Sequence, residues 1–387
     1  NQRSICIKVY VESRRMLELK KADEQYLDDT EVFIGKDVLE LLSSSMYVNP
    51  LSIFREYIQN STDGIDDAVS AGLLSNTDDG RININLDHID RRVIIRDNGI
   101  GVSNKDFAFK MLSFGASGKR GTDARGFRGV GRLSGLGYVQ KLIFRSRSAG
   151  DDKVLEASWD GRTIKRVLST ETEKNDLKSI VSEAIDLKSL EPEDYPPHFF
   201  EVEIVKPRRI ANDRLLNEVE IASFIGQVCP CPFSPSFSFG KEINEHLKEH
   251  GRAGRSYNIF INDEEEPVYR PYADKIKYSD YKEAGLKSLK TFKIDTIDGD
   301  LAAIGWLIHH DYEGAIPSTT GVRGLRARVG NIQVGNDRLF VDIFPEERFC
   351  SWTIGEIHIL DGRVVPNGRR DEFENNTHLD NIVAHLR

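Results

Sequence analysis

Glycine is concentrated in one short part of this chain, and that concentration limits what the segment can fold into. Ten of the 31 glycines lie within residues 95–140 of the 387-residue sequence. Because glycine has no Cβ, it adopts positive φ readily and lets backbone approach a ligand, but it weakens regular helices and strands. The segment is therefore expected to be either a flexible loop or a ligand-binding loop. The residues around it distinguish between the two.

The overall composition excludes two classes of protein. The chain carries 53 Lys and Arg against 62 Asp and Glu, a formal net charge of −9, so we do not expect a nucleic-acid coat protein. One of the longest apolar runs, Ala302–Ile308, is far shorter than the roughly 18 residues that a membrane-spanning helix needs. Four scattered cysteines favour a reducing cytosol over a disulfide scaffold. We therefore expect a cytoplasmic protein of two or three domains without a membrane segment.

A helix predicted at residues 52–71 carries the first candidate site. Four of its polar residues fall within about 60° of arc on one face: Glu56, Asn60, Asp63 and Asp67. A carboxylate and an amide oxygen one turn apart can serve as a water activator and a metal ligand. The alternative is an ordinary solvated helix face.

Two alternating runs typical of strands follow at residues 81–87 and 91–97, and the second leads into the sequence Asp-Asn-Gly-Ile-Gly-Val. Gly99 and Gly101 permit positive φ and let a ligand approach bare backbone. Asp97, at the bend, can accept a hydrogen bond from an amino group. A plain Asp-Asn-Gly turn is the alternative.

The third element is the segment Gly126–Tyr138, in which glycines at 126, 129 and 131 precede a run compatible with a helix. Free backbone N–H groups and a helix dipole in such a segment suit phosphate. No Gly-Lys-Ser/Thr follows, so it is not a Walker loop, and its spacing does not fit the dinucleotide fingerprint. Residues 119–147 hold eight basic residues and one acidic residue, which favours a polyphosphate ligand despite the overall charge. A flexible basic loop is the alternative.

The order of these three elements resembles the GHKL ATPase superfamily, which includes the ninety-kilodalton heat-shock chaperone, gyrase B, MutL and the MORC proteins. The resemblance covers roughly residues 30–206. It is strongest to the bacterial heat-shock-protein-90-like (HtpG-like) ATPases, because residues 126–134 follow their G-x-x-G-V-G-x-x-S pattern and Ser117-Gly118-Lys119 is similar to their lid entry. It implies an α+β chain in which a GHKL (Bergerat) ATP-binding α/β sandwich precedes a transducer-like αβ domain.

Carried over residue by residue, the resemblance implies that ATP and Mg²⁺ are the cofactors. Glu56 would polarise the attacking water, and Asn60 would coordinate Mg²⁺ that bridges the phosphates. Asp97 would accept a hydrogen bond from the adenine amino group, with Gly101 closing against the base. Asp63 matches a pocket position near the base or the ribose.

The resemblance also assigns the glycine-rich segment. Backbone N–H groups of residues 126–131 would hold the β- and γ-phosphates, and residues 103–125 would form a lid over ATP. The implied ATP-binding residues are Asn60, Asp63, Asp97, Gly99, Gly101, Ser117, Gly118, Lys119, Gly126, Phe127, Arg128, Gly129, Val130 and Gly131.

One position departs from the family pattern. The family has a Gly-Thr pair on a late strand whose hydroxyl supports the adenine site, whereas this chain reads His-Phe-Phe-Glu-Val at residues 198–202. No hydroxyl is expected there, so that corner of the pocket stays unassigned.

A domain boundary is expected near residue 208. It divides the chain into an ATP-binding domain at residues 1–208 and a transducer-like domain at residues 209–387. The first domain would include a possible N-terminal arm at residues 1–30 and a charged helical insert at residues 171–193.

In the second domain the sequence Pro-Asn-Gly-Arg-Arg-Asp at residues 366–371 resembles the chaperone's middle-domain loop P-L-N-x-S-R-E, with one residue fewer. On that match Arg370 corresponds to the catalytic arginine, which would stabilise charge on the transferring phosphoryl group. The alternative is that Arg369 and Arg370 pair with Asp371 and Glu372 on a surface. A second basic cluster supplies the fallback candidates Arg323, Arg326 and Arg328.

The resemblance implies slow ATP hydrolysis coupled to lid closure and to dimerisation, as in a chaperone-like conformational switch. Two other outputs stay open. One is a DNA-engaging clamp of the MutL or MORC kind, supported only by the basic lid and residues 323–328. The other is a nucleotide-gated regulator of an effector domain, for example in antiphage defence. The expected partners are ATP, a second copy of the chain, and a protein client or effector; nucleic acid is not favoured.

Overall fold

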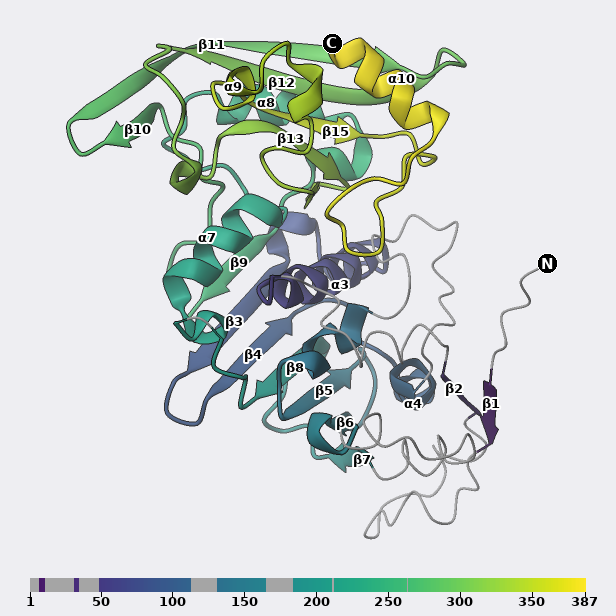
Figure 1. The fold of residues 1–387 in the computed structure, drawn as a ribbon. Coiled ribbons are helices and arrows are strands. Elements are labelled where there is room, and N and C mark those ends of the chain that lie inside the picture. Colours follow the sequence, from purple (N-terminus) through teal and green to yellow (C-terminus); the bar gives the residue numbers. More distant parts are fainter. Residues whose placement is uncertain are drawn as a thin grey trace, which may run out of the picture. The chain divides into compact units, whose positions relative to one another are not determined.

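The structure is a computed structural model, and it describes residues 7–10, 31–34, 49–112, 131–164, 184–210, 212–262 and 264–387. The chain divides into two compact units, each with its own sheet (Figure 1). The first unit comprises Asn1–Ile221 and Asn258–Pro267, and the second comprises Ala222–Tyr257 and Val268–Arg387. The described residues form both helices and strands, with runs of successive strands, which confirms the expected α+β fold.

The first unit is built on a seven-stranded sheet with the strand order β7-β6-β5-β8-β4-β3-β9. Neighbouring strands are antiparallel except β3 and β9, which run parallel. The strands are β3 (Arg81–Asp87), β4 (Arg92–Asp97), β5 (Lys141–Arg147), β6 (Val154–Asp160), β7 (Ile185–Leu190), β8 (Phe199–Val205) and β9 (Asn258–Ile261). β3 and β4 occupy the two runs that the alternation of apolar residues predicted, so that prediction is confirmed.

Helix α3 (Ser52–Ser70) packs on one face of this sheet (Figure 1). Val93 of β4 lies opposite Ile204 of β8, and both side chains are buried on that face. Because side chains alternate along a strand, Asp97 at the end of β4 points to the same face, opposite Phe200. The acidic residue of the predicted bend therefore faces the apolar core rather than the opposite side of the sheet.

The other elements of the first unit are shorter. Strands β1 (Ile7–Tyr10) and β2 (Glu31–Ile34) form an antiparallel pair of their own. The described helical segments are α4 (Asn104–Leu112) and the 3-10 helices Thr77–Asp79, Gly131–Gly137 and Arg214–Leu216. Helix α7 (Glu218–Val228) begins in the first unit and ends in the second.

The face of the sheet opposite α3 carries a network of charged side chains. Arg145 donates hydrogen bonds to the carboxylates of Glu156, Glu201 and Glu203, each with an N···O distance of 2.7 Å. Arg96 donates to Glu201 at 2.6 Å. The apolar core of the unit therefore lies between the other face and α3, as expected for a two-layer α/β sandwich.

Strand β7 shows that the expected helical insert at residues 171–193 is wrong over its last part. Ile185 lies opposite Trp159 in an antiparallel pairing of β7 with β6. Ile185 and Leu187 alternate with charged residues, which is the pattern of a half-buried strand, and this alternation outweighs the high density of charge. Residues 165–183 lie outside the described part of the chain.

The division between the units differs from the single boundary expected near residue 208. The first unit continues past that point, because the Arg91 guanidinium binds the Asp213 carboxylate with an N···O distance of 2.9 Å. The chain also returns to it later, since β9 extends the sheet beside β3 and the Asn262 side chain accepts a hydrogen bond from the Leu86 N–H. The chain crosses between the units after Ile221, Tyr257 and Pro267.

The second unit is built on a six-stranded sheet with the order β10-β11-β12-β15-β13-β14. Its strands are antiparallel except β13 and β15, which are parallel. The strands are β10 (Lys275–Ser279), β11 (Lys282–Asp295), β12 (Leu301–His310), β13 (Gly324–Val329), β14 (Ile332–Val334) and β15 (Ile354–Ile359). The described helices are α8 (Gly240–Lys248), α9 (Glu347–Cys350), α10 (Thr377–Leu386) and the 3-10 helices Gly251–Gly254, Ser318–Thr320 and Val341–Ile343.

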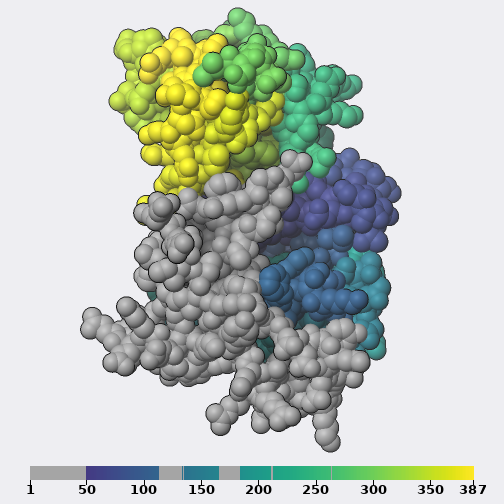
Figure 2. Space-filling model, turned by 90° about the vertical axis from the view of Figure 1, so that its right-hand side faces the viewer, coloured from purple at the N-terminus to yellow at the C-terminus, as the bar shows by residue number. Residues whose placement is uncertain are grey.

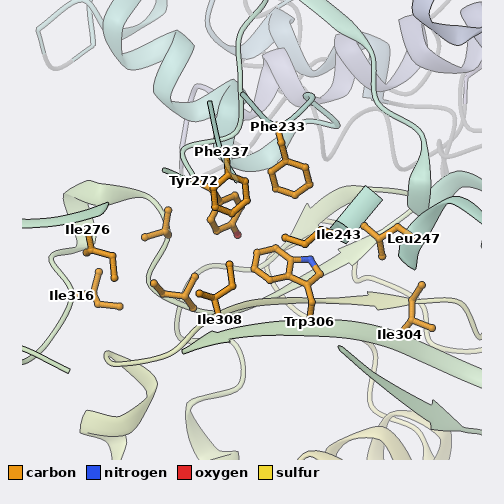
Figure 3. Close-up of a cluster of buried hydrophobic side chains, with 12 residues drawn as sticks. Phe233, Phe237, Ile243, Leu247, Tyr272, Ile276, Ile304, Trp306, Ile308 and Ile316 are labelled. Carbon is orange, nitrogen blue, oxygen red and sulfur yellow. The ribbon is translucent and has the colours of Figure 1, made fainter. Parts of the chain in front are cut away.

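One face of this second sheet carries a cluster of buried apolar side chains around Trp306 (Figure 3). The rings of Tyr272 and Phe233 pack edge-on to Trp306, with centroid distances of 5.1 and 6.2 Å. Ile243 and Leu247 of helix α8 belong to the same cluster. Edge-to-face packing of this kind adds to the stabilisation that burial of the rings already provides.

Helix α10 covers the other face. Its residue Ile382 is fully buried in a second cluster together with Ile357 of β15 and Val334 of β14. The C-terminal part of the chain lies at the surface of this unit (yellow in Figure 2). No helix in the described ranges is both long enough and apolar enough to cross a membrane.

Candidate functional site

The polar face of α3 is largely removed from solvent. Glu56 and Asn60 are half-buried and Asp63 is buried, whereas Asp67 is exposed. An ordinary solvated face would leave all four residues exposed, so that alternative holds for Asp67 alone. The first three are the residues to which the motif resemblance assigned roles.

Glu56 is oriented by its neighbour in the sequence. The Nε and Nη2 atoms of Arg55 lie 3.2 and 3.1 Å from Oε1 of Glu56 and donate to it. The Arg55 side chain is itself buried. The ion pair therefore fixes the direction of the Glu56 carboxylate on the half-buried side of the helix.

Asp97 has a carboxyl group buried from solvent. Its side chain is 3% exposed, and Oδ1 accepts a hydrogen bond from the Gly99 N–H at 2.9 Å. The Phe200 N–H and the Ser61 hydroxyl also donate to it. Burial raises the pKa of Asp97 to about 7 even though all three hydrogen bonds lower it. One more hydrogen-bond donor would therefore lower the pKa of Asp97 and favour its ionised form.

The bend after Asp97 is tight against its surroundings. A Cβ on Gly99 would lie 2.6 Å from the carbonyl carbon of Gly64 on α3, and the Ile100 N–H donates to the Gly64 carbonyl at 2.9 Å. Gly101 has φ +72, and a Cβ there would lie 2.0 Å from the Arg147 carbonyl oxygen. Glycine is required at both positions because a Cβ would clash with backbone, and of the two only Gly101 has the positive φ that the sequence suggested.

Three side chains at this bend were not predicted from the sequence. Ser61 of α3 donates to Asp97. The Asp97 carboxylate thus has a hydroxyl partner from α3, although the start of β8 offers none. Ser146 accepts from the Val102 N–H at 2.7 Å and donates to the Phe199 carbonyl, and His198 Nδ1 lies 2.8 Å from the Gly99 carbonyl oxygen. No local motif marks these residues, because sheet register and helix packing bring them to the bend.

Most of the predicted phosphate segment lies outside the described residues. These positions are Ser117, Gly118, Lys119, Gly126, Phe127, Arg128, Gly129 and Val130. Gly131 begins the 3-10 helix Gly131–Gly137, and the described part of the predicted lid contains α4, with Phe107 and Met111 buried. Of the predicted arm at residues 1–30, only β1 is described.

Arg370 lies in a tight loop of the second unit. Pro366 and Phe373 form a β-bridge at its base, and the Asn367 N–H donates to the Glu372 carbonyl at 2.9 Å. Arg370 has φ +56, and its carbonyl accepts from the Gly335 N–H at 2.9 Å. A residue other than glycine persists in this conformation only where its surroundings hold it, and such residues concentrate at functional sites.

The fallback cations Arg326 and Arg328 are not available for such a role. Their side chains are buried, because the alternation of β13 turns both toward the inside of the unit. Arg328 donates to Glu356 at 2.7 Å and Arg326 donates to Gln333 at 2.9 Å. Two members of the predicted basic cluster are therefore buried in polar contacts, and the third, Arg323, is paired with Asp337.

Glu356 is the centre of a buried ionic network. Arg270 donates to its Oε2 at 2.6 Å, and the Tyr272 hydroxyl donates to its Oε1 at 3.1 Å. Burial alone would raise the pKa of Glu356, but Arg270 and Arg328 lower it well below its usual range. The same arginines donate to backbone carbonyls that include that of Cys231, so the network also ties irregular segments to β15.

We expect the substitution Glu356→Gln to lower the free energy of unfolding by about 3–5 kcal/mol, because it leaves two buried arginines without their counter-charge. Urea denaturation at pH 7 measures this loss. Since the folded-state pKa lies below the unfolded one, the stabilisation is present above about pH 4.5 and is lost as the pH falls. The exposed pair of Glu347 with Arg338 provides the control, and Glu347→Gln should cause no measurable loss. Equal stability of Glu356→Gln and the wild type would contradict the role of the network.

Comparison with known proteins adds independent evidence. Residues 51–192 match the family described as histidine kinase-, DNA gyrase B-, and HSP90-like ATPase. The chain is 30% identical over 145 residues to the chaperone protein HtpG of Rickettsia typhi, which covers 33% of this chain and 23% of that protein. HtpG of Coxiella burnetii is 32% identical over 142 residues, and these cover 32% and 22% of the two chains. The matched part is thus less than a quarter of the length of these relatives.

The matched residues include α3, β3, β4, the bend at Asp97 and strands β5 to β7. They contain Glu56 and Asn60 as well, so the family match and the buried site concern the same part of the fold. The resemblance drawn from the three sequence elements is confirmed for this part. Residues 51–192 of this chain match the GHKL-type, HSP90-like ATPase family.

Proposed function

We propose that this protein binds ATP with Mg²⁺ and hydrolyses it, and that hydrolysis drives a chaperone-like conformational cycle. The observation that carries the proposal is the Asp97 carboxyl group, buried at a bend whose glycines pack against α3. A buried carboxyl that already accepts three hydrogen bonds, with a pKa of about 7, is suited to accept one more from an amino group. The exocyclic amino group of adenine supplies that donor.

Hydrolysis is assigned to Glu56. Its carboxylate is half-buried and held by Arg55, so it has the fixed direction that a general base needs to take a proton from water. Asp63 is buried two turns beyond Glu56 on the polar face and would line the pocket near the base or ribose. The phosphates would be held by the predicted segment at residues 126–131.

The residues around Glu56 fit a magnesium ion that arrives with the nucleotide. Mg²⁺ takes oxygen ligands and usually keeps water and phosphate oxygens rather than a cage of protein carboxylates. The described residues contain no group of three or more His, Cys, Asp or Glu that could form such a cage, whereas Asn60 presents an amide oxygen one turn from Glu56. Bound there, Mg²⁺ would neutralise charge on the phosphates.

Arg370 is proposed as the cation that would stabilise charge on the γ-phosphate. Support comes from its resemblance to the chaperone loop and from its constrained backbone with φ +56. Lid closure by residues 103–125 and dimerisation would accompany ATP binding, as the HSP90-like family match favours. The name of the relatives, chaperone protein HtpG, supports a protein client as the target of the cycle.

Calorimetry and a turnover assay test the proposal directly. The purified chain should bind ATP in the presence of Mg²⁺ and release phosphate slowly, and chelation of Mg²⁺ should abolish the release. A chain that binds neither ATP nor ADP would overturn the proposed function. Binding of ATP without any release of phosphate would mean that the protein binds ATP but does not hydrolyse it.

We expect the affinity for adenosine to rise between pH 6 and pH 8. The amino donor favours the ionised form of Asp97, so binding lowers the pKa of that carboxyl group from about 7 and releases a proton. Below pH 7 this proton must be removed before binding, which weakens affinity by up to about tenfold per pH unit. Competition binding with adenosine avoids titration of phosphate in the same range. An affinity that does not change with pH would contradict this use of Asp97.

A further inference from the structure

The bend that follows Asp97 is anchored by side chains that belong to none of the sequence motifs. We propose that His198 is a positioning residue for base binding, which fixes Gly99 and through it the Asp97 carboxylate. The proposal rests on the proposed nucleotide function and goes beyond it by assigning a role to a residue just before β8. It concerns the corner of the pocket where the family hydroxyl is missing.

The contact itself is direct. His198 Nδ1 lies 2.8 Å from the Gly99 carbonyl oxygen, and the histidine is half-buried. A carbonyl oxygen only accepts, so the imidazole carries its hydrogen on Nδ1 and donates. The residue immediately precedes β8, whose backbone is held by pairing with β4 and β5. The donor is therefore attached to a rigid part of the sheet.

Gly99 transmits this contact to Asp97. The Gly99 N–H donates to Asp97 Oδ1 at 2.9 Å, while its Cα packs against the backbone of Gly64. The helix side of Gly99 is thus closed by α3, and its carbonyl is held by His198, just before β8. If that hydrogen bond is lost, Gly99 can rotate, and the N–H that orients the Asp97 carboxylate rotates with it.

A second anchor at the other end of the bend supports this reading. Ser146 Oγ accepts from the Val102 N–H at 2.7 Å and donates to the Phe199 carbonyl at 2.9 Å. The Ser146 side chain is completely buried. Adjacent residues at the start of β8, His198 and Phe199, therefore hold the two ends of the bend. In the family pattern a hydroxyl on this strand supports the adenine site by direct contact. Here the residues at the beginning of β8 would support it indirectly, by positioning the bend that carries Asp97.

Three variants test the proposal. His198→Leu removes the donor, and His198→Asn keeps one, because the asparagine amide nitrogen is as many bonds from the backbone as Nδ1. The control is His88→Leu, an exposed histidine in the turn at the far end of β4. The measurements are calorimetric Kd values for ATP and ADP, together with KM and kcat for ATP hydrolysis.

We expect His198→Leu to raise both Kd values by the same factor, about threefold to tenfold, and to raise KM with kcat unchanged. His198→Asn and His88→Leu should bind like the wild type. Unchanged Kd values in His198→Leu would overturn the proposal, and so would an equal loss of affinity in the Leu and Asn variants. Failure of the wild type to bind nucleotide would instead overturn the proposed function.

Discussion

The substitution Asp97→Asn is expected to weaken ATP binding at least about 100-fold while the chain stays folded. Asp97 accepts from the Gly99 N–H, the Phe200 N–H and the Ser61 hydroxyl, and adenine would add a fourth donor. An asparagine amide has one acceptor oxygen and two N–H donors, so it would oppose a donor with a donor at this buried position. Isothermal titration calorimetry with ATP measures the loss.

The exposed Asp67 on α3 provides the matched control, since Asp67→Asn makes the same chemical change outside the site. Circular dichroism and thermal melting of both variants separate loss of binding from loss of structure. An Asp97→Asn variant that binds ATP within about threefold of the wild type would remove Asp97 from the base site.

The second large effect is expected at Glu56. Glu56→Ala should retain ATP affinity and lose hydrolysis by about 100-fold to 10,000-fold, which is the contribution typical of a positioned general base. Glu56→Gln is the sharper version, because its amide oxygen still accepts from Arg55 in place of Oε1 while the side chain no longer takes a proton. Single-turnover phosphate release with saturating ATP measures the chemical step without a contribution from binding.

Both variants must be purified free of other ATPases, and Asp67→Asn again serves as the unaffected comparison. Wild-type turnover in Glu56→Gln would refute the assignment of Glu56 as the base. Loss of ATP affinity in Glu56→Gln would show that the residue binds nucleotide rather than activating water.

The residues that the sequence predicted well are those whose neighbours along the chain determine their surroundings. The alternation in Arg81–Asp87 located β3, and Gly101 needs positive φ because of the bend in which it lies. Asp97 and the polar side of α3 are proposed as site residues because of their spacing along the chain. Local periodicity and turn chemistry carry enough information for such positions.

The residues that were missed depend on pairing between distant parts of the chain. His198 and Ser146 reach the bend only because β8 and β5 lie in a particular register, and Ser61 reaches Asp97 only because α3 packs on that face. Arg328 is buried beside Glu356 because β13 pairs with β15, which follows it by more than 20 residues in the sequence. A single sequence does not contain the register of its strands, so these contacts could not be derived from it.

Strand β9 has a consequence for how the first unit could be transferred from one gene to another. A gene segment that ends at residue 208 encodes β3 without the strand that pairs with it from Arg81 to Ile84. The row of unpaired N–H and C=O groups would make the product prone to edge-to-edge aggregation. Recombination or engineering must therefore carry residues 258–262 along with the rest of the first unit, and with them the stretch of the second unit in between. We therefore expect the two units to be inherited together rather than as separate domains.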